Sequence, residues 1–171
     1  MQENIGTLNR DMAEDARISP RHDALRYLDD VLRYAFARLG SREEAEDVAM
    51  EVFVAAFRIR SHFPKKVDPK IYLIGIARRK IADLVRRRLR QRGKDTISIS
   101  DPTWVDQGYQ PSQELLETLE ALRPLPELQR DALILKYFHG FSTQEISQIL
   151  RKSPQAVNSL LQRGREAIQS Q

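Results

Sequence analysis

The stretch FSTQEISQILRKSPQAVNSLLQRGREAI, residues 141–168, decides the fold of the C-terminal part of the chain. Ser142 and Glu145 have the spacing of a capping box, which satisfies the free amide groups at the start of a helix. Ser153 then suits the N-cap of a second helix, and Pro154 suits its first turn, where no amide donor is needed. The inner faces follow at helical spacing: Ile146, Ile149 and Leu150, then Val157, Leu161, Gly164 and Ile168. Two short helices joined in this way are typical of a helix-turn-helix.

The outward face of the second helix is polar. Its side chains can all form hydrogen bonds: Gln155, Asn158, Ser159, Gln162 and Arg163. Such side chains suit the phosphate oxygens and base edges of a DNA major groove. A plain helical hairpin is the alternative interpretation of the same pattern.

Breaks in the apolar pattern divide the rest of the chain. Residues 20–92 have helical spacing interrupted at Gly40, at Pro64 and Pro69, which predicts three or four helices. Residues 93–113 lack this period, so we expect a flexible linker there, with a short strand at 97–100 as a weaker option. Helical spacing returns over residues 114–171, and residues 1–19 are expected to be a disordered tail. The predicted fold is all-α, with two small helical domains joined by the linker and a helix-turn-helix in the second.

Composition excludes several classes of protein. The chain has 171 residues, of which 41% are hydrophobic and 30% charged, and its apolar runs are too short to span a bilayer. There is no cysteine, and His22, His62 and His139 stand too far apart for a metal motif. We therefore expect no cofactor and no metal. We expect each histidine to be at the surface or half-buried. The N-terminus lacks the apolar stretch of a secretory signal, which predicts a cytoplasmic protein without a membrane partner.

The helix that follows Gly40 has two apolar faces. It starts at Ser41, which forms a capping-box pattern with Glu44. One face is a core stripe of Ala45, Val48, Ala49, Val52, Ala56 and Ile59. The opposite face mixes acids with large apolar side chains: Glu43, Asp47, Met50, Glu51, Val54 and Phe57. Such a face marks a protein partner, or else a helix packed between two neighbours of its own domain.

The segment from about Ile71 to Arg92 predicts a basic amphipathic helix. Its inner stripe is Ile74, Ala77, Ile81, Leu84 and Val85, and cations cover much of the remainder: Arg78, Arg79, Lys80, Arg86, Arg87 and Arg90. The net charge of the chain is only +4, but this average hides a strong segregation, because residues 78–94 contain nine cations and one acid, Asp83. A membrane surface, a nucleic acid or solvent alone could receive them. Nucleic acid is favoured because the helix offers no exposed Trp or Phe for a bilayer.

Several separated motifs between residues 25 and 168 resemble those of the extracytoplasmic-function (ECF) subfamily of bacterial sigma factors. EAEDVAMEVF (44–53) is similar to the family's D-A-E-D-L-V-Q-E-T-F helix, which docks on the clamp helices of the largest subunit of core RNA polymerase. The resemblance implies that this helix binds polymerase through Glu43, Glu46, Asp47, Met50, Glu51 and Val54.

The motif YLIGIARRKIADLVRRRLR (72–90) resembles the family's W-L-x-x-I-A-R-N-x-x-x-D-x-x-R-R helix, which melts the promoter's minus-ten element and holds a flipped base. Tyr72 stands where the family usually has Trp, and Arg79 stands where it usually has Asn. The resemblance implies DNA binding by Tyr72, Arg78, Arg79, Lys80, Asp83, Arg86, Arg87 and Arg90.

The motif LRPLPELQRDALILKYFHGFSTQEI (122–146) is similar to the family domain that reads the minus-thirty-five element and touches the polymerase flap. Implied DNA-binding residues are Ser153, Gln155, Ala156, Asn158, Ser159, Gln162, Arg163 and Arg165. The chain departs from the family at Arg151, Ala156, Asn158 and Leu160, which replace Gly, Thr, Lys and Arg. Either this helix reads DNA weakly and relies on a protein recruiter, or Leu160 simply widens the core.

The resemblance implies a sigma factor, which binds core RNA polymerase and directs promoter recognition, DNA melting and transcription initiation, and which is not an enzyme. Promoter DNA and an anti-sigma factor or another recruiting protein are the further implied partners. The alternative is a helix-turn-helix regulator that acts without polymerase, which would leave the acidic helix and the linker unexplained. A nucleic-acid enzyme would require carboxylates or histidines converging on a metal, and the acids here lie on a docking face or in the linker.

Overall fold

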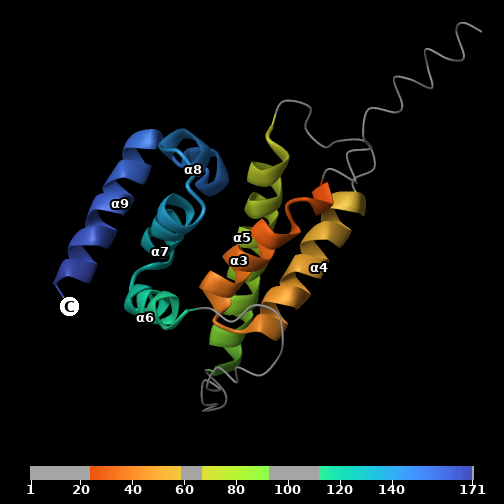
Figure 1. Cartoon of the computed structure of the whole chain (residues 1–171), viewed down its shortest axis with the longest axis horizontal. Helices are drawn as coiled ribbons and strands as arrows, with labels where there is room; N and C mark the ends of the chain where they lie inside the picture. Colours follow the sequence, from red (N-terminus) through yellow and green to blue (C-terminus); the bar gives the residue numbers. More distant parts are fainter. Residues whose placement is uncertain (1–23, 59–66, 93–111, 171) are drawn as a thin grey trace, which may run out of the picture.

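The computed structural model describes residues 24–58, 67–92 and 112–170. Within these ranges all regular structure is helical, and the helices form two groups that lie side by side (Figure 1). The all-α prediction is therefore confirmed. The expected N-terminal tail, the short strand considered at 97–100 and nearly all of the expected linker lie outside the described residues.

The first domain is built from three helices: α3 (Leu28–Leu39), α4 (Arg42–Arg58) and α5 (Pro69–Arg92). Gly40 ends α3 with a φ of 71°, a left-handed conformation that glycine adopts without steric cost. Its amide donates to the Phe36 carbonyl at 2.8 Å. The Ser41 hydroxyl then accepts from the Glu44 amide at 3.4 Å, as its cap position predicts. The chain therefore turns sharply, and α4 packs back against α3.

The helix α5 begins two residues before the predicted start at Ile71. The Asp68 carboxylate accepts from the Lys70 amide at 2.7 Å, and Pro69 occupies the first helical position, where its missing donor is harmless. The three helices share one core, in which Val52, Ile74 and Ile81 are fully buried. Burying a side chain of this size contributes about 1.5–3 kcal/mol.

The second domain is built from α6 (Gln113–Leu122), α7 (Glu127–Leu133) with its π-helical continuation η1 (Ile134–Phe138), α8 (Thr143–Leu150) and α9 (Pro154–Gln169). Ser112 caps α6 by accepting from the Leu115 amide at 3.2 Å. The helix therefore starts at Gln113, which the sequence had placed at the end of the linker.

The helix-turn-helix forms as predicted. Ser142 and Glu145 make a complete capping box at α8, and Ser153 accepts from the Ala156 amide at 3.2 Å at α9. Arg151, at the turn, has a φ of 53°, which explains why glycine suits this position. A Cβ on Gly164 would lie 2.8 Å from Leu133 Cδ1, so a larger residue here would force the Leu133 side chain to shift where α9 packs against α7.

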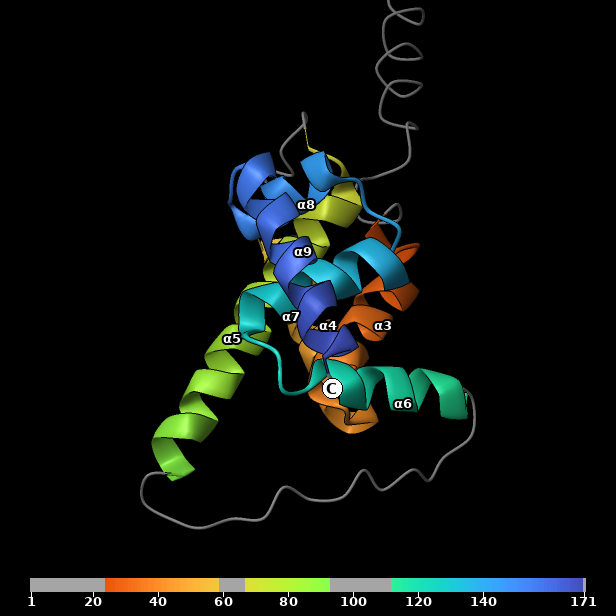
Figure 2. The same cartoon turned by 90° about the vertical axis from the view of Figure 1, so that its left-hand side faces the viewer.

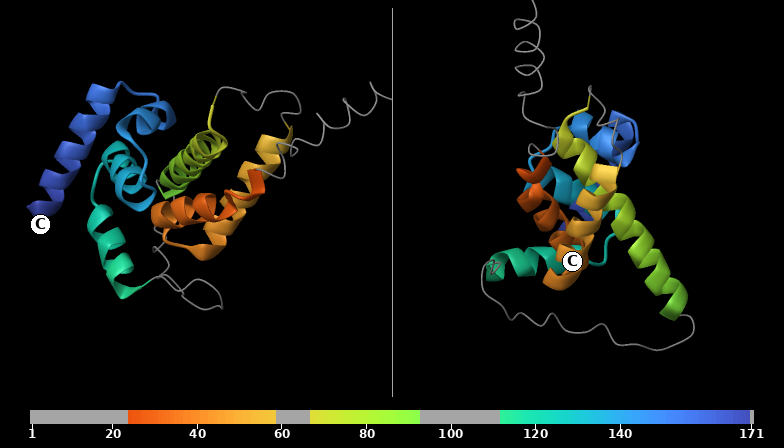
Figure 3. Two further views of the ribbon diagram at one scale, coloured as in Figure 1. Left: turned by 45° about the horizontal axis from the view of Figure 1, so that its top comes forward. Right: turned by 90° about the vertical axis from the view of Figure 1, so that its right-hand side faces the viewer.

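The two domains pack against each other through α3 and α5 on one side and η1 and α8 on the other. The helix α4 lies at one end of the molecule and α9 at the opposite end (Figures 1 and 3). Residue His139 as a whole is half-buried, as expected, but its side chain is only 1% exposed and lies against Tyr34 of the first domain.

Candidate protein and nucleic-acid interfaces

The outward face of α4 is exposed along its length. Met50 is 66% exposed and Val54 48%, and the acids around them are exposed as well. All six predicted polymerase-binding residues lie on this face: Glu43, Glu46, Asp47, Met50, Glu51 and Val54. The alternative of a helix packed between two neighbours of its own domain is therefore wrong, since no described element covers this face.

An open groove runs beside this face between α4 and α5. It has a volume of about 500 Å³ and is lined by Met50, Glu51, Val54, Ala55, Arg58 and Lys80. Lys80 Nζ lies 2.8 Å from the Glu51 carboxylate, so this ion pair joins the two helices across the groove. Lys80 was expected to face DNA, and the structure places it beside the acids of α4.

The apolar part of the outward face ends at Val54. Phe57 was expected there, but it is half-buried against the core, with its ring 5.9 Å from that of Phe53. Phe57 therefore belongs to the edge of the core and not to the exposed apolar patch, which consists of Met50 and Val54.

The exposed surface of α5 is strongly basic toward its C-terminal end, which extends beyond the body of the domain (Figure 2). Arg79, Arg86, Arg87 and Arg90 are exposed. Asp83 is exposed beside them and accepts from Arg86 Nη1 at 2.9 Å. The half-buried Arg88 pairs with Glu44 of α4 and so braces α5 against its neighbour. Tyr72 is half-buried and packs against the core. Among the α5 residues whose side chains the structure describes, these four arginines make up most of the basic surface.

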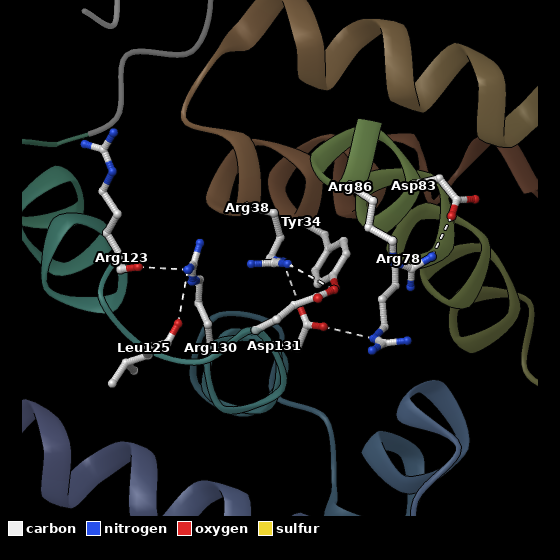
Figure 4. A network of polar contacts seen from close by, with 10 residues as sticks. Tyr34, Arg38, Arg78, Asp83, Arg86, Arg123, Leu125, Arg130 and Asp131 are labelled. Carbon is white, nitrogen blue, oxygen red and sulfur yellow. Dashed lines mark hydrogen bonds and ion pairs between the residues drawn. The ribbon is translucent and has the colours of Figure 1, made fainter. Parts of the chain in front are cut away.

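Arg78 points away from this surface and toward the second domain (Figure 4). Its Nε donates to the Asp131 carboxylate of α7 at 2.9 Å. The Tyr34 hydroxyl donates to the same carboxylate at 3.0 Å, and Arg38 Nε lies 2.6 Å from it. Asp131 is fully buried. Burial and the Asp131 charge raise the pKa of Tyr34 well above its ordinary value, so its hydroxyl keeps its proton and remains a donor.

Arg130, a residue of the third sequence motif, has a local role. Its guanidinium donates to the carbonyls of Arg123 and Leu125 at 2.8 and 3.1 Å, and these bonds fix the turn between α6 and α7 (Figure 4). Burial, followed by the nearby charge of Arg38, lowers the pKa of Arg130. The position therefore supports the fold of the second domain.

The outer face of α9 is available to a ligand. The exposed residues of the predicted DNA-binding set are Ser153, Gln155, Asn158, Gln162, Arg163 and Arg165, while Ala156 and Ser159 are half-exposed. The Ser153 oxygen is already engaged in its cap, and Thr143 Oγ1 donates to Asn158 Oδ1 at 3.4 Å. Leu160 is half-buried and packs against the core, as one of the two interpretations of this residue predicts.

The comparisons with known proteins agree over both domains. Residues 24–91 match Sigma-70 region 2, and residues 115–168 match Sigma-70, region 4. The chain is 32% identical to the ECF RNA polymerase sigma factor ShbA of Streptomyces griseus, over 90% of this chain and 87% of the relative. The chain belongs to the ECF subfamily of RNA polymerase sigma factors. As such, it binds core RNA polymerase and promoter DNA and directs transcription initiation.

Further relatives of this ECF sigma factor cover most of the chain. SigW of Bacillus subtilis is 28% identical over 85% of this chain and 84% of its own length. Among solved structures, the sigma factor RpoE of Bartonella quintana, in complex with the anti-sigma factor NepR, has a similar fold. Its TM-score is 0.74 at 23% identity, covering 86% of this chain and 92% of that one.

Two kinds of feature were sought among the described residues of this ECF sigma factor: membrane-spanning helices and metal-binding clusters. No described helix is long and apolar enough to cross a membrane. No group of three His, Asp or Glu residues within the described ranges is arranged to hold a metal ion.

Sequence reasoning missed the residues between the domains, namely Tyr34, Arg38, Asp131 and His139. One signal was present in the sequence. Asp131 lies three and four residues before Ile134 and Leu135, which places it on the same buried helix face as these apolar residues. A carboxylate on such a face needs buried partners.

Proposed function

We propose that the two domains of this sigma factor divide the work of initiation. Residues 20–92 dock on core polymerase and open the minus-ten element, the segment from 93 to about 112 connects the domains, and the remainder holds the minus-thirty-five element. The factor works in the cytoplasm, where polymerase and DNA are, and it acts by binding and positioning rather than by bond chemistry.

The exposed face of α4 carries the proposal. Met50 and Val54 together expose apolar area that a lone domain would normally bury, and a ring of acids surrounds them. An apolar centre with a charged rim is the usual anatomy of a protein interface. The acids predict a basic partner surface, and the family resemblance implies that this partner is the clamp helices of the largest polymerase subunit.

The DNA-binding part of the proposal rests on two surfaces. The exposed arginines of α5 supply cations for the phosphates of the melted minus-ten region. The outer face of α9 supplies hydrogen-bonding side chains for upstream duplex DNA. Because α4 and α9 lie at opposite ends of the molecule, polymerase and upstream DNA do not compete for one surface (Figure 1).

Gel filtration with core polymerase, followed by transcription from a promoter library, tests the proposal. We expect the chain to co-elute with core polymerase and to make it start transcripts at a defined set of promoters. A chain that binds promoter DNA but never co-elutes would be a helix-turn-helix regulator acting without polymerase. Transcripts without any dependence on the chain would refute the assignment to initiation.

An anti-sigma factor or recruiting protein remains a predicted partner. A protein that covered the α4 face would block polymerase directly, since that face is the proposed docking surface. Competition between such a protein and core polymerase for the chain is the measurement that checks this.

A further inference from the structure

The last turn of α5 carries an exposed leucine among arginines. Leu89 is 62% exposed and continues the apolar stripe of the helix, in which Ile81 is fully buried and Val85 packs against the core. The C-terminal end of α5 extends beyond the body of the first domain, so the core ends before Leu89 (Figure 2). Leu89 therefore contributes little to the packing of the described helices.

The side chains around Leu89 are basic. Arg86 lies one turn before it and Arg90 directly after it, and both are exposed. Asp83 pairs with Arg86, but Arg87 and Arg90 contact no carboxylate among the described residues. A single exposed leucine is ordinary on a protein surface. A leucine inside a basic surface of this kind suits a partner that is anionic outside and apolar within.

Duplex DNA has this chemistry, because its phosphates are anionic and its stacked bases are apolar. Proteins that bend DNA use basic side chains at the minor groove and insert an apolar side chain such as leucine between two base pairs. An anionic membrane fits less well, because an interfacial helix needs a continuous apolar face. In α5 the rest of that face, from Ile74 to Ile81, is buried in the core.

We propose that Leu89 is a wedge that enters the minor groove of the duplex beside the melted minus-ten region, unstacks one base step and bends the DNA there. The proposal rests on the proposed role of α5 in promoter binding. Leu89 lies ten residues after Arg79, the first exposed arginine of the helix, which corresponds to about 15 Å along the helix axis. Since base pairs are spaced by about 3.4 Å, the wedge acts within about five base pairs of the DNA that Arg79 contacts.

The leucine and the arginines make different contributions. The arginines neutralise phosphates, which makes binding depend on salt concentration. Leu89 carries no charge, so it changes the shape of the DNA without changing that dependence. Pyrimidine–purine steps such as TA and CA unstack most easily. Promoters used by this factor should therefore carry such a step where the wedge enters.

The probe for the wedge is a promoter fragment from the transcription library, bound by the holoenzyme, with its minus-ten region kept open by mismatched bases. The permanent opening removes strand separation from the measurement. The adenine analogue 2-aminopurine, whose fluorescence rises when it is unstacked, is placed at one position at a time in the duplex within about five base pairs of the opening.

Three variants separate the wedge from other effects. Leu89→Gln makes the side chain polar while keeping a good helix former. Leu89→Met keeps an apolar side chain at the same position. Leu25→Gln removes another exposed leucine of the first domain, which is 51% exposed and lies outside α5.

With the unaltered chain we expect raised fluorescence at one position of the duplex. Leu89→Gln should lose this rise and keep the salt dependence of binding, whereas Leu89→Met and Leu25→Gln should keep the rise. The wedge would be overturned if no position showed raised fluorescence with the unaltered chain, or if Leu89→Gln showed the same rise.

Arg90→Ala tests the proposed role of α5 separately. The slope of log affinity against log salt concentration should become shallower by about 0.9, because one duplex phosphate loses its counter-charge. An unchanged slope would count against promoter binding by this end of α5, and the wedge would fail with it. A shallower slope together with an unchanged fluorescence pattern in Leu89→Gln would overturn the wedge alone.

Discussion

Acidification should destabilise the chain through His139. The side chain is 1% exposed and lies between the rings of Tyr34 and Phe141. Burial, with a smaller contribution from the charge of Arg33, lowers the pKa of His139 from 6.5 to about 4. The folded chain therefore excludes a proton that the unfolded chain binds.

The size and the window of this effect follow from the two pKa values. Above pH 6.5 the imidazole is neutral in both states, so it adds no pH dependence. Between pH 6.5 and about 4 only the unfolded imidazole binds the proton, and the free energy of unfolding falls as the pH falls. At about 1.36 kcal/mol per pH unit, the loss over this window is roughly 3 kcal/mol. Below about pH 4 the imidazole of the folded chain also binds the proton, so the free energy of unfolding no longer falls because of His139.

Urea unfolding followed by circular dichroism across this pH range measures the effect, and His139→Leu is the control. Leucine keeps an apolar contact at this position but cannot titrate, so the variant should lose the extra pH dependence. Asp30 and Glu145, whose pKa values are lowered, lose their contributions only below their ordinary values of 3.8 and 4.5. Equal pH dependence in the two chains would mean that the folded protein accepts the proton, and the reasoning would be refuted.

Three further predictions concern surface positions. Replacing Arg86, Arg87 and Arg90 by Ala should weaken promoter complexes. The slope of log affinity against log salt concentration should become shallower by about 0.9 for each duplex phosphate that loses its arginine, as binding at several salt concentrations can measure. An unchanged slope would mean that these arginines only face solvent. Arg151→Gly should stabilise the chain by about 0.5–1 kcal/mol in thermal unfolding, because it relieves a left-handed φ at an exposed residue; a lower melting temperature would contradict this. Asn158→Lys should raise the affinity of the chain for upstream duplex DNA if α9 is a weak reader, whereas selective binding by the unaltered chain at about 10⁻⁸ M would refute weak reading.

Local signals predicted the helices well because they act within a few residues. Gly40 and Ser41 fix a helix end and the next helix start, and the capping box at Ser142 works in the same way. The apolar stripes also identified the core faces, since each helix has one strongly apolar side. The predicted start of α5 at Ile71 lies two residues too late, because the prediction did not consider Asp68 as the N-cap and Pro69 as the first helical residue.

Packing between distant segments could not be predicted in this way. Phe57 and Leu160 sit at the edges of core stripes, and only the tertiary neighbours decide whether such residues are covered. Asp131 and Arg78 are far apart in sequence, and their contact depends on how one domain rests on the other. The sequence analysis assigned Arg78 to DNA from the charge pattern of α5 alone. That pattern contains no information about Asp131, the carboxylate in the other domain that binds Arg78.

The candidate polymerase surface was predictable for a physical reason. On α4 the acids and Met50 fall opposite the core stripe, so a single helix already determines that they face outward. The family resemblance then supplied the identity of the partner. The exposure of this face agrees with the prediction, while the polymerase contact itself stays a prediction.

The docking role of α4 is tested most directly by measuring how tightly core polymerase binds a variant in which two acids of the α4 face are changed to arginine. Asp47 and Glu51 are exposed, so changing both to Arg should leave the fold intact, as thermal unfolding can verify. The exposed Lys80–Glu51 pair that this change removes contributes at most about 1 kcal/mol. The control reverses two exposed acids of α6, Glu114 and Glu117, which lie outside the proposed surface.

Affinity for core polymerase is then compared among the three chains by fluorescence titration. Reversing both charges should place like charges opposite the basic partner surface and weaken binding at least tenfold, which corresponds to about 1.4 kcal/mol. The control chain should bind as the unaltered chain does. Undiminished binding by the Asp47→Arg, Glu51→Arg chain, with its fold intact, would contradict the assignment of α4 as the polymerase-docking helix.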